Sequence, residues 1–421
     1  MKNVFQYFVV LMLAALGLNA QAQGDRDLNY YRFPDKRGIN VFEAPKDTVT
    51  EFDGVKVRIG GSSTLQFQAL DHENSGSVEL IEIGDNFNLA TANLDLDVAL
   101  YDGVRMHLRT YLSSRHHTET YVKGGYFQID KLDFIREGFM EDLMRNVTLR
   151  IGHMENNYGD AHFRRTDNAQ AMYNPFVGNL IMDGFTTEVG GEVYFRKNGF
   201  ISMVGLTNGK LNQSVTNPGS TKASFVAKLG FDDQLSEDFR LRLTGSIYST
   251  GKANRIYLYS GDRAGSRYYY VMENTEARAS SDFRSGRFNP GFSGELTSLM
   301  INPFFKYKGL EFFGVYENAS GKSGEGTESR SFNQIAGELL YRFGKNENFY
   351  IGTRYNTVSG ELASGEDVDI SRLQLGGGWF MTKNILAKLE YVNQTYDGFP
   401  SDDILNEGKF SGLMLEAAIS F

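Results

Sequence analysis

The chain has 421 residues, with 46 glycines, 32 phenylalanines, 23 tyrosines and no cysteine, and its formal net charge is −9. The absence of cysteine excludes a disulfide scaffold, a thiol nucleophile, a cysteine-ligated zinc site and a lipid-modified N-terminal cysteine. Aromatic residues make up 13% of the chain, which is too many for a disordered protein, and the acidic charge offers no general attraction to nucleic acid. The length fits two or three soluble domains or one large barrel.

Residues 1–22 have the pattern of a cleaved export signal. One basic residue, Lys2, precedes the apolar run Phe8–Leu18, and the sequence Ala-Gln-Ala ends at residue 22 as a cleavage site. The alternatives are a buried N-terminal helix or a membrane anchor, but an anchor needs about 20 apolar residues. We therefore predict an exported protein. The polar residues 23–54 that follow read as a periplasmic tail or a partial plug.

Beyond residue 22 no long apolar run remains, so an exported chain either stays soluble or crosses a membrane as closed β-strands. The sequence alternates with a period of two, as strands do. In one segment Val104, Met106 and Leu108 share a parity opposite to that of Arg105, His107 and Arg109, and the last residues of the chain alternate in the same way. About 16 such segments are predicted, at 55–71, 86–101, 104–115, 121–135, 146–155, 184–196, 199–209, 221–231, 239–250, 291–307, 310–318, 331–343, 348–359, 367–381, 385–396 and 408–421.

The connections between these segments alternate between short and long. Short turns on one side and long loops on the other are the signature of an outer-membrane β-barrel, in which an even strand count leaves both termini in the periplasm. Aromatic residues gather near the short turns, as in a membrane girdle. They are Tyr101, Phe134, Phe195, Phe231, Tyr307, Phe343, Phe380 and Phe421. The alternative, a soluble β-sandwich, does not explain this position or the polarity of the other parity. We predict an all-β transmembrane antiparallel barrel over 55–421.

The polar parity should face the lumen, because charges near the middle of the lipid face cost a few kcal/mol each. A barrel of about 16 strands is too wide for its own side chains to fill and typically leaves an aqueous channel. For any single residue the simpler interpretation is a solvated wall with ion pairs between neighbouring strands. Arg105, His107, Arg109 and Arg150 fall close together and can form a basic ladder. The predicted pore-lining residues are Arg105, His107, Arg109, Arg150, Arg240, Arg242 and Arg354.

The third long loop, at 156–183, is rich in both charges and aromatic residues. A loop of this length usually has a function, and folding it into the lumen would place its charges at a constriction, where rings of charge set ion selectivity. The alternative is an external flap. The predicted constriction residues are Asp160, His162, Arg164, Arg165 and Asp167. The longest loop, at 251–290, is expected to be mostly solvated, with contact to anionic lipid phosphates or attraction of anions as the functional alternative.

The sequence contains no nucleophile elbow, phosphate-binding loop or zinc-protease motif. His116 and His117 have only Glu119 near them as a third ligand, so a metal site is not predicted. We expect neither an enzyme nor a bound cofactor.

Two stretches resemble the phosphate-selective porin O and P family. They are Leu149–Gly159 (LRIGHMENNYG), which leads into the third loop, and Glu188–Phe195 (EVGGEVYF), which follows it. The resemblance extends loosely from about residue 55 to the terminal Phe421. It implies a 16-stranded trimeric porin with an inward third loop and an arginine ladder, for which Arg105, Arg109 and Arg150 are available. The third loop of this chain has Arg164 and Arg165 but no lysine, and acidic residues are interspersed.

The sequence therefore favours an outer-membrane porin of a gram-negative bacterium: a passive, water-filled channel for small hydrophilic solutes, with anions or phosphate as the preferred class. Its expected partners are outer-membrane lipid and lipopolysaccharide, the solutes, and further copies of the chain in a homotrimer. The alternative is a plugged barrel that acts as a structural or binding component of a surface complex. A barrel enzyme is a third possibility, but no strand places a catalytic set at the rim.

Overall fold

A computed structural model describes residues 28–112, 121–166, 170–209, 221–253, 256–260, 267–278, 282, 286–324 and 326–421. The predicted signal peptide, His116, His117 and Asp167 lie outside the described residues, and the predictions for them stay predictions. No helix in the described part of the chain is long and apolar enough to cross a membrane.

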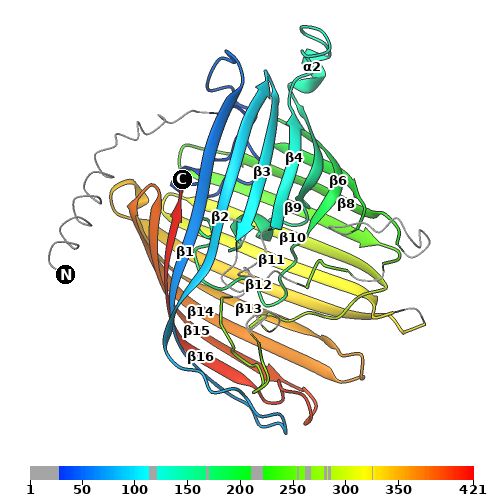
Figure 1. The fold of residues 1–421 in the computed structure, drawn as a ribbon, viewed down its shortest axis with the longest axis vertical. Coiled ribbons are helices and arrows are strands. Elements are labelled where there is room, and N and C mark those ends of the chain that lie inside the picture. Colours follow the sequence, from blue (N-terminus) through cyan, green and yellow to red (C-terminus); the bar gives the residue numbers. More distant parts are fainter. Residues whose placement is uncertain are drawn as a thin grey trace, which may run out of the picture.

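Sixteen antiparallel strands form one closed barrel, in which each strand pairs with its neighbours in sequence and β1 also pairs with β16 (Figure 1). The first eight are β1 (Lys56–Glu73), β2 (Asn86–Tyr101), β3 (Val104–Leu112), β4 (Tyr121–Ile129), β5 (Val147–Glu155), β6 (Thr187–Lys197), β7 (Phe200–Thr207) and β8 (Ser224–Gln234). The others are β9 (Phe239–Thr250), β10 (Glu295–Tyr307), β11 (Leu310–Lys322), β12 (Arg330–Phe343), β13 (Phe349–Glu361), β14 (Asp367–Thr382), β15 (Ile385–Asp397) and β16 (Lys409–Ser420). Short helical turns are η1 (Lys36–Gly38), α2 (Glu141–Met144), η2 (Ala161–Arg164) and η5 (Lys345–Glu347). The predicted barrel, with its short turns and long loops, is confirmed.

Several predicted strand ends are off by two to four residues, and the largest error among the described residues is at β4. The strand predicted at 121–135 ends at Ile129, and residues 130–146 form a long turn with the helix α2. The carboxylate of Asp130 points into the barrel and accepts hydrogen bonds from Thr148 at 2.6 Å and Lys46 at 3.0 Å. Beyond it the backbone folds on itself, with the Ile135 amide donating to the Leu132 carbonyl at 2.9 Å. These local bonds replace the pairing that a longer strand would need.

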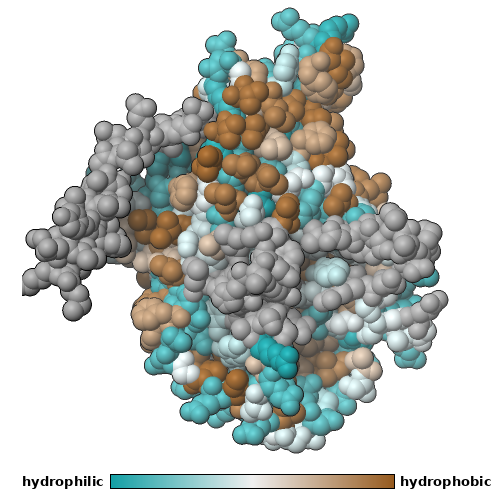
Figure 2. Space-filling view, viewed as in Figure 1, coloured by the Kyte–Doolittle hydropathy of each residue, from teal (hydrophilic) through white to brown (hydrophobic). Residues whose placement is uncertain are grey.

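The outer face of the barrel is apolar, as the alternation requires. In β16, Leu413 and Leu415 are 49% and 48% exposed on the outside, whereas Met414 and Glu416 between and beside them are buried inside. Brown apolar surface covers much of the described wall in Figure 2, above all over the strands at its upper side. A closed sheet pairs every interior backbone group, so this apolar face can meet lipid without unsatisfied amides.

Aromatic residues mark the short-turn end of the wall. Trp379, Phe349 and Phe343 stack in a row, with ring centroids 6.0 and 5.8 Å apart. Phe380, predicted to belong to this girdle, is instead buried on the inside, and Trp379 takes the outer position. The regular alternation of β14 explains this, because Trp379 shares the outward parity of Leu373 and Leu375, and Phe380 therefore points inward. Phe134 lies on the β4–β5 turn rather than on a strand.

The inside of the barrel is filled by three segments rather than by water alone. They are the N-terminal segment (28–50), the third loop (156–186) and the described parts of the long loop between β9 and β10 (251–294). The third loop folds inward, as predicted. The long loop was expected to be mostly solvated, but Leu258, Tyr268 and Val271 are almost fully buried in one apolar cluster with third-loop residues. The wide aqueous lumen expected from strand number alone is therefore reduced, because the chain supplies its own filling.

The outward position of Leu415 generates a stability prediction. Leu415→Arg places a charge near the middle of β16 on the lipid face, and we expect the free energy of unfolding to fall by about 2–4 kcal/mol. Urea unfolding in phospholipid vesicles measures this change. Asp402→Arg, on an exposed loop, is the control and should leave stability unchanged. Equal effects of the two substitutions would contradict the assignment of this face to lipid.

Candidate functional site

The third loop is held in the lumen by side chains of the barrel wall. The backbone amide of Val177 donates to Glu390 at 2.7 Å, that of Ile181 to Asn356 at 2.7 Å, and that of Met182 to Gln334 at 2.9 Å. A buried amide without a partner costs about 1–3 kcal/mol, so a loop can enter the lumen only where the wall offers acceptors. The polar parity of the strands provides them. The inner wall therefore serves as the hydrogen-bond partner of the loop.

Asp160 is the most buried charge of the third loop. Arg242 donates to both of its oxygens at 2.8 Å, and Lys228 donates to one at 2.9 Å. Arg242 also binds Glu43 of the N-terminal segment at 2.8 Å. Burial disfavours both carboxylates, but the two cations outweigh it, lowering the pKa of Glu43 to about 2 and that of Asp160 well below its ordinary value. This node, Asp160 with Arg242, Lys228 and Glu43, joins the loop, the wall and the N-terminal segment.

The two arginines of the third loop are also in ion pairs. Arg164 donates to Glu311 at 2.8 Å and to Glu338 at 3.0 Å, on two neighbouring strands. Burial opposes the charge of Arg164, but these carboxylates raise its pKa. Arg165 binds Asp183 through two hydrogen bonds of 2.9 and 2.6 Å, which close the loop on itself. Neither guanidinium is available to an ion in the lumen.

The N-terminal segment crosses the inside of the barrel near the short turns. The amide of Lys36 donates to the Lys383 carbonyl in the β14–β15 turn at 2.9 Å, and Lys46 donates to the Val147 carbonyl on the other side at 2.6 Å. Between them Arg32 lies over the ring of Tyr173 in the third loop, 3.7 Å from its centroid. Such a cation–π contact contributes about 0.5–2 kcal/mol. The segment is thereby tied to the wall and to the third loop.

The described parts of the long loop cover the third loop from the other side. Tyr268 donates to Glu390 at 2.7 Å, the carboxylate that also holds Val177. Tyr259 donates to Glu317 at 2.6 Å, and Arg372 of the wall donates to the carbonyl of Gly286. These contacts explain why the loop is buried, because its tyrosines donate hydrogen bonds to carboxylates of the wall.

A cavity of about 130 Å³ remains between the wall formed by β2–β5 and the inner segments. That volume has room for several water molecules. The strands contribute Asp95, Asp97, Arg105, His107, Arg109, Lys123, Tyr126, Arg150 and Glu155, the N-terminal segment contributes Tyr31 and Arg32, and the third loop contributes His162, Phe163 and Tyr173. Four predicted pore-lining residues, Arg105, His107, Arg109 and Arg150, therefore share one cavity.

The charges of this wall are partly compensated. Arg109 binds Asp95 through two hydrogen bonds of 2.7 and 2.8 Å, and His107 binds Asp97 at 2.8 Å. Arg150 donates to Gln128, and within the described residues neither Arg150 nor Arg32 is ion-paired with a carboxylate. The lining holds five arginine and lysine side chains against three carboxylates, two positive charges in excess when histidine is neutral. Burial lowers the pKa of His162, so it adds no charge near pH 7.

A second cavity of about 410 Å³ opens at the short-turn end. Arg240 lies there, bound to Asp232 at 2.8 and 2.7 Å and to the Asn40 carbonyl at 2.9 Å. The charged residues of its lining are Lys36, Arg240, Lys306, Lys308 and Arg342, with Glu237, Asp238 and Glu347 as the acids. This lining also has two more positive than negative side chains.

Some of the predicted site residues line a cavity, and others are buried against the inner segments. Arg242 and Arg354 point inward but are buried beneath the third loop; Arg354 donates to the Gly178 carbonyl at 2.8 Å and binds Glu338. Of the predicted constriction residues that are described, only His162 lines the cavity of about 130 Å³. Lys228 was missed, although its parity in β8 was available as a signal. Tyr31 and Arg32 gave no signal, because the N-terminal segment has no periodicity.

No group of three or more histidine, aspartate or glutamate side chains that could hold a metal ion occurs in the part of the chain that the structure describes. The arrangement can hold water and small ions, and its charges can select among them.

The Asp160 node generates a second prediction. Asp160→Asn leaves Arg242 and Lys228 buried with one carboxylate fewer, and losing one member of a buried pair costs about 3–5 kcal/mol. The loss is measured as the decrease in the free energy of unfolding in vesicles. Asp402→Asn, at an exposed position, is the matched control. A decrease no larger than that of the control would show that the node does not anchor the loop.

Comparison with solved structures identifies proteins of similar fold, whereas sequence comparisons find no match. No protein-family model matches the chain, and no curated protein sequence matches it. Among solved structures, OmpT of Vibrio cholerae in its trimer form aligns with a TM-score of 0.53 at 11% identity, over 88% of this chain and 100% of that chain. An anion-selective porin from Comamonas acidovorans aligns at 0.55 and 10%, over 87% and 100%, and OprB of Pseudomonas putida at 0.53 and 11%, over 87% and 94%. The chain is therefore similar in fold to outer-membrane porins.

Proposed function

We propose that the chain is an outer-membrane porin of restricted bore, a passive channel for small hydrophilic solutes that prefers anions. The observation that supports this most is the polar cavity along β2–β5, where the wall, the N-terminal segment and the third loop leave space beside five cationic side chains. The passage would run along this wall, past Arg105, Arg109 and Arg150. The porin-like fold agrees with this role.

The preference for anions follows from charge and geometry. Both the cavity at β2–β5 and the cavity at the short-turn end have two positive side chains in excess. In a narrow, water-poor passage such an excess raises the local concentration of anions and lowers that of cations. Phosphate is a member of this class, but the ladder arginines are shared with Asp95 and Asp97, which weakens a selectivity for multiply charged anions.

The remaining expectations form part of the same proposal. The signal at 1–22 would direct export to a gram-negative outer membrane, where lipid and lipopolysaccharide surround the apolar face. The short turns would then lie in the periplasm, with the N-terminal segment entering from that side. A homotrimer is proposed by analogy with the matched trimer form of OmpT.

Conductance tests this function directly. Purified protein in planar bilayers should give discrete current steps, and a salt gradient should give a reversal potential that indicates anion preference. Arg150→Gln removes one charge from the cavity; at about 6 Å in water this raises the energy of an anion and lowers that of a cation by about 0.7 kcal/mol each, so the anion-to-cation permeability ratio should fall about tenfold. Arg145→Gln, on the outside of the barrel with a side chain 64% exposed, should leave the ratio unchanged.

A second candidate function is a plugged barrel that serves a surface complex. It is favoured by the burial of the N-terminal segment, whose Phe42 is 2% exposed and whose Glu43 is fixed to Arg242. The two functions differ in what the N-terminal segment does. As one wall of a passage it tunes an open channel, and as a plug it closes it.

Removal of residues 28–50 separates these functions. If the parent chain is a narrow porin, the deletion should enlarge an existing conductance severalfold, because the segment fills the lumen near the short turns. If it is plugged, the parent should be silent and only the deletion variant should conduct. Heat-modifiable migration of the folded barrel in gels is the control that the variant is assembled. A silent parent would sink the porin proposal.

A further inference from the structure

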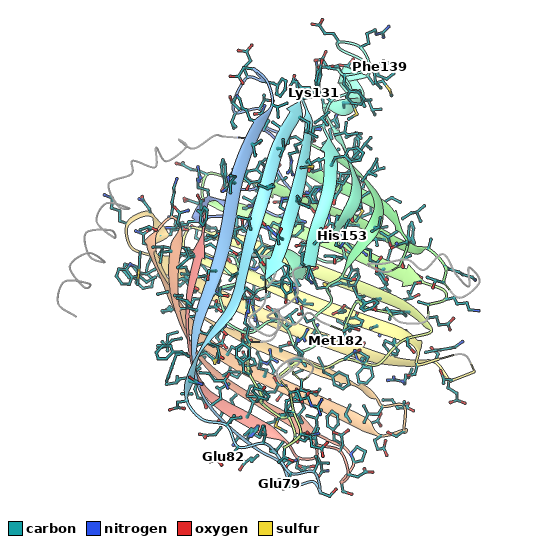
Figure 3. The ribbon with its side chains drawn as sticks, in the orientation of Figure 1. Glu79, Glu82, Lys131, Phe139, His153 and Met182 are labelled. Carbon is teal, nitrogen blue, oxygen red and sulfur yellow. The ribbon has the colours of Figure 1, made fainter. Side chains whose placement is uncertain are left out.

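The turn between β4 and β5 differs from the other turns at its end of the barrel. The β2–β3, β6–β7, β10–β11 and β14–β15 turns have two residues each, whereas this turn spans 130–146. In Figure 3, Phe139 and Lys131 lie at the upper rim, at the opposite end of the molecule from Glu79 and Glu82 of the β1–β2 loop. A short turn would connect the strands equally well, so the additional residues need another explanation.

The turn is ordered by its own hydrogen bonds. The Gly138 amide donates to the Asp133 carboxylate at 3.0 Å, and the Met144 amide donates to the Met140 carbonyl at 2.9 Å. Lys131 binds Asp102 in the neighbouring β2–β3 turn at 2.6 Å. The segment is therefore a defined structure that presents particular side chains.

Those side chains are apolar and exposed. Phe134, Ile135, Met140 and Leu143 are 48%, 59%, 48% and 45% exposed. Apolar residues gathered on one exposed segment mark a surface that meets lipid or another molecule. The polar residues have separate contacts: Arg145 binds Glu141 at 2.8 Å and Asp142 at 3.3 Å.

The turn is continuous with the lipid-facing surface of the barrel. Phe127 of β4 and Ile151 of β5 are 40% and 45% exposed on the outside. Ile129 has the same parity as Phe127 but is only 9% exposed, so something outside the sheet covers it. The segment within reach is the turn that begins at the next residue. In Figure 1 the turn projects beyond the end of β4 at the rim, and in Figure 2 apolar surface continues upward to it.

We propose that residues 131–145 form a membrane foot, which inserts Phe134, Ile135, Met140 and Leu143 into the boundary between headgroups and acyl chains on the short-turn side. Interfacial elements with an apolar face and a charged face bind bilayers in this way. Lipid is the favoured occupant because the apolar surface of the foot joins the belt that lipid already covers. The proposal rests on the barrel fold and does not depend on conductance through the lumen.

The single tryptophan of the chain, Trp379, allows a direct test. It is 46% exposed on the outer face and serves as the lipid-contacting reference. In a Trp379→Phe background, Phe134→Trp places the only indole on the foot, and Asp402→Trp places it on an exposed loop at the other end. The full-length variants are reconstituted in phosphatidylcholine vesicles whose acyl chains carry bromine near the headgroup.

We expect bromine to quench the indole of the Phe134→Trp variant as strongly as it quenches Trp379 in the parent chain, and to leave the indole at position 402 unquenched. A red-shifted, unquenched indole at position 134 would place the foot in water and overturn the proposal. Blue-shifted emission without quenching would show that protein covers the foot, either a second copy or another chain, and would overturn it as well. Ile135→Trp repeats the measurement at a second position if the first variant does not assemble.

Discussion

Every backbone amide and carbonyl at the height of a bilayer needs a hydrogen-bond partner inside the protein, and this requirement governs the structure at two levels. At the first level the sixteen strands satisfy one another by closing, with β1 paired to β16. At the second level the segments inside the barrel have no sheet of their own. Their amides are bound by wall side chains, as Val177 is by Glu390 and Ile181 by Asn356. The inward polar side chains of the wall therefore bind the inner segments first, and only those that remain unoccupied can contact solutes.

This use of the inner wall determines where space remains. Around β8–β15 the wall arginines and carboxylates deeper in the barrel are occupied by loops, as Arg354 and Glu338 illustrate, and open space there is found at the short-turn end beside Arg240. Along β2–β5 the charges bind mostly to one another, as Arg109 binds Asp95, and they are left facing a cavity. Charges that neutralise one another across neighbouring strands do not need a loop to cover them. The proposed passage therefore lies where most wall charges are paired with neighbouring wall residues, without a loop covering them. The cavity lining there still has two more positive than negative side chains.

The sequence made the barrel predictable and left much of its interior hidden. Period-two alternation, such as Leu413 and Leu415 against Met414 and Glu416, depends only on neighbouring residues, so it identified the strands and the lipid face. The inward third loop followed from its length and composition. The N-terminal segment was read as a tail or a partial plug, but its contacts could not be predicted, because pairs such as Arg32 with Tyr173 join residues far apart in the chain and leave no periodic pattern. Phe380 was misplaced because nearness to a turn was used in place of parity, which puts Trp379 outside and Phe380 inside. The end of β4 was misplaced because a turn breaks the alternation there.

The node around Asp160 shows how the width of the lumen is fixed. Arg242 of the wall binds Asp160 of the third loop and Glu43 of the N-terminal segment at the same time. Arg242 also binds Asp232 at 3.0 Å, so if either carboxylate moved away the buried guanidinium would lose one of three acidic partners, which is unfavourable by about 3–5 kcal/mol. The two segments are therefore coupled through one side chain, so a movement of either one weakens the anchoring of the other. The number of strands sets the maximum width of the lumen. The width that remains depends on the buried ion pairs that hold the inner segments to the wall.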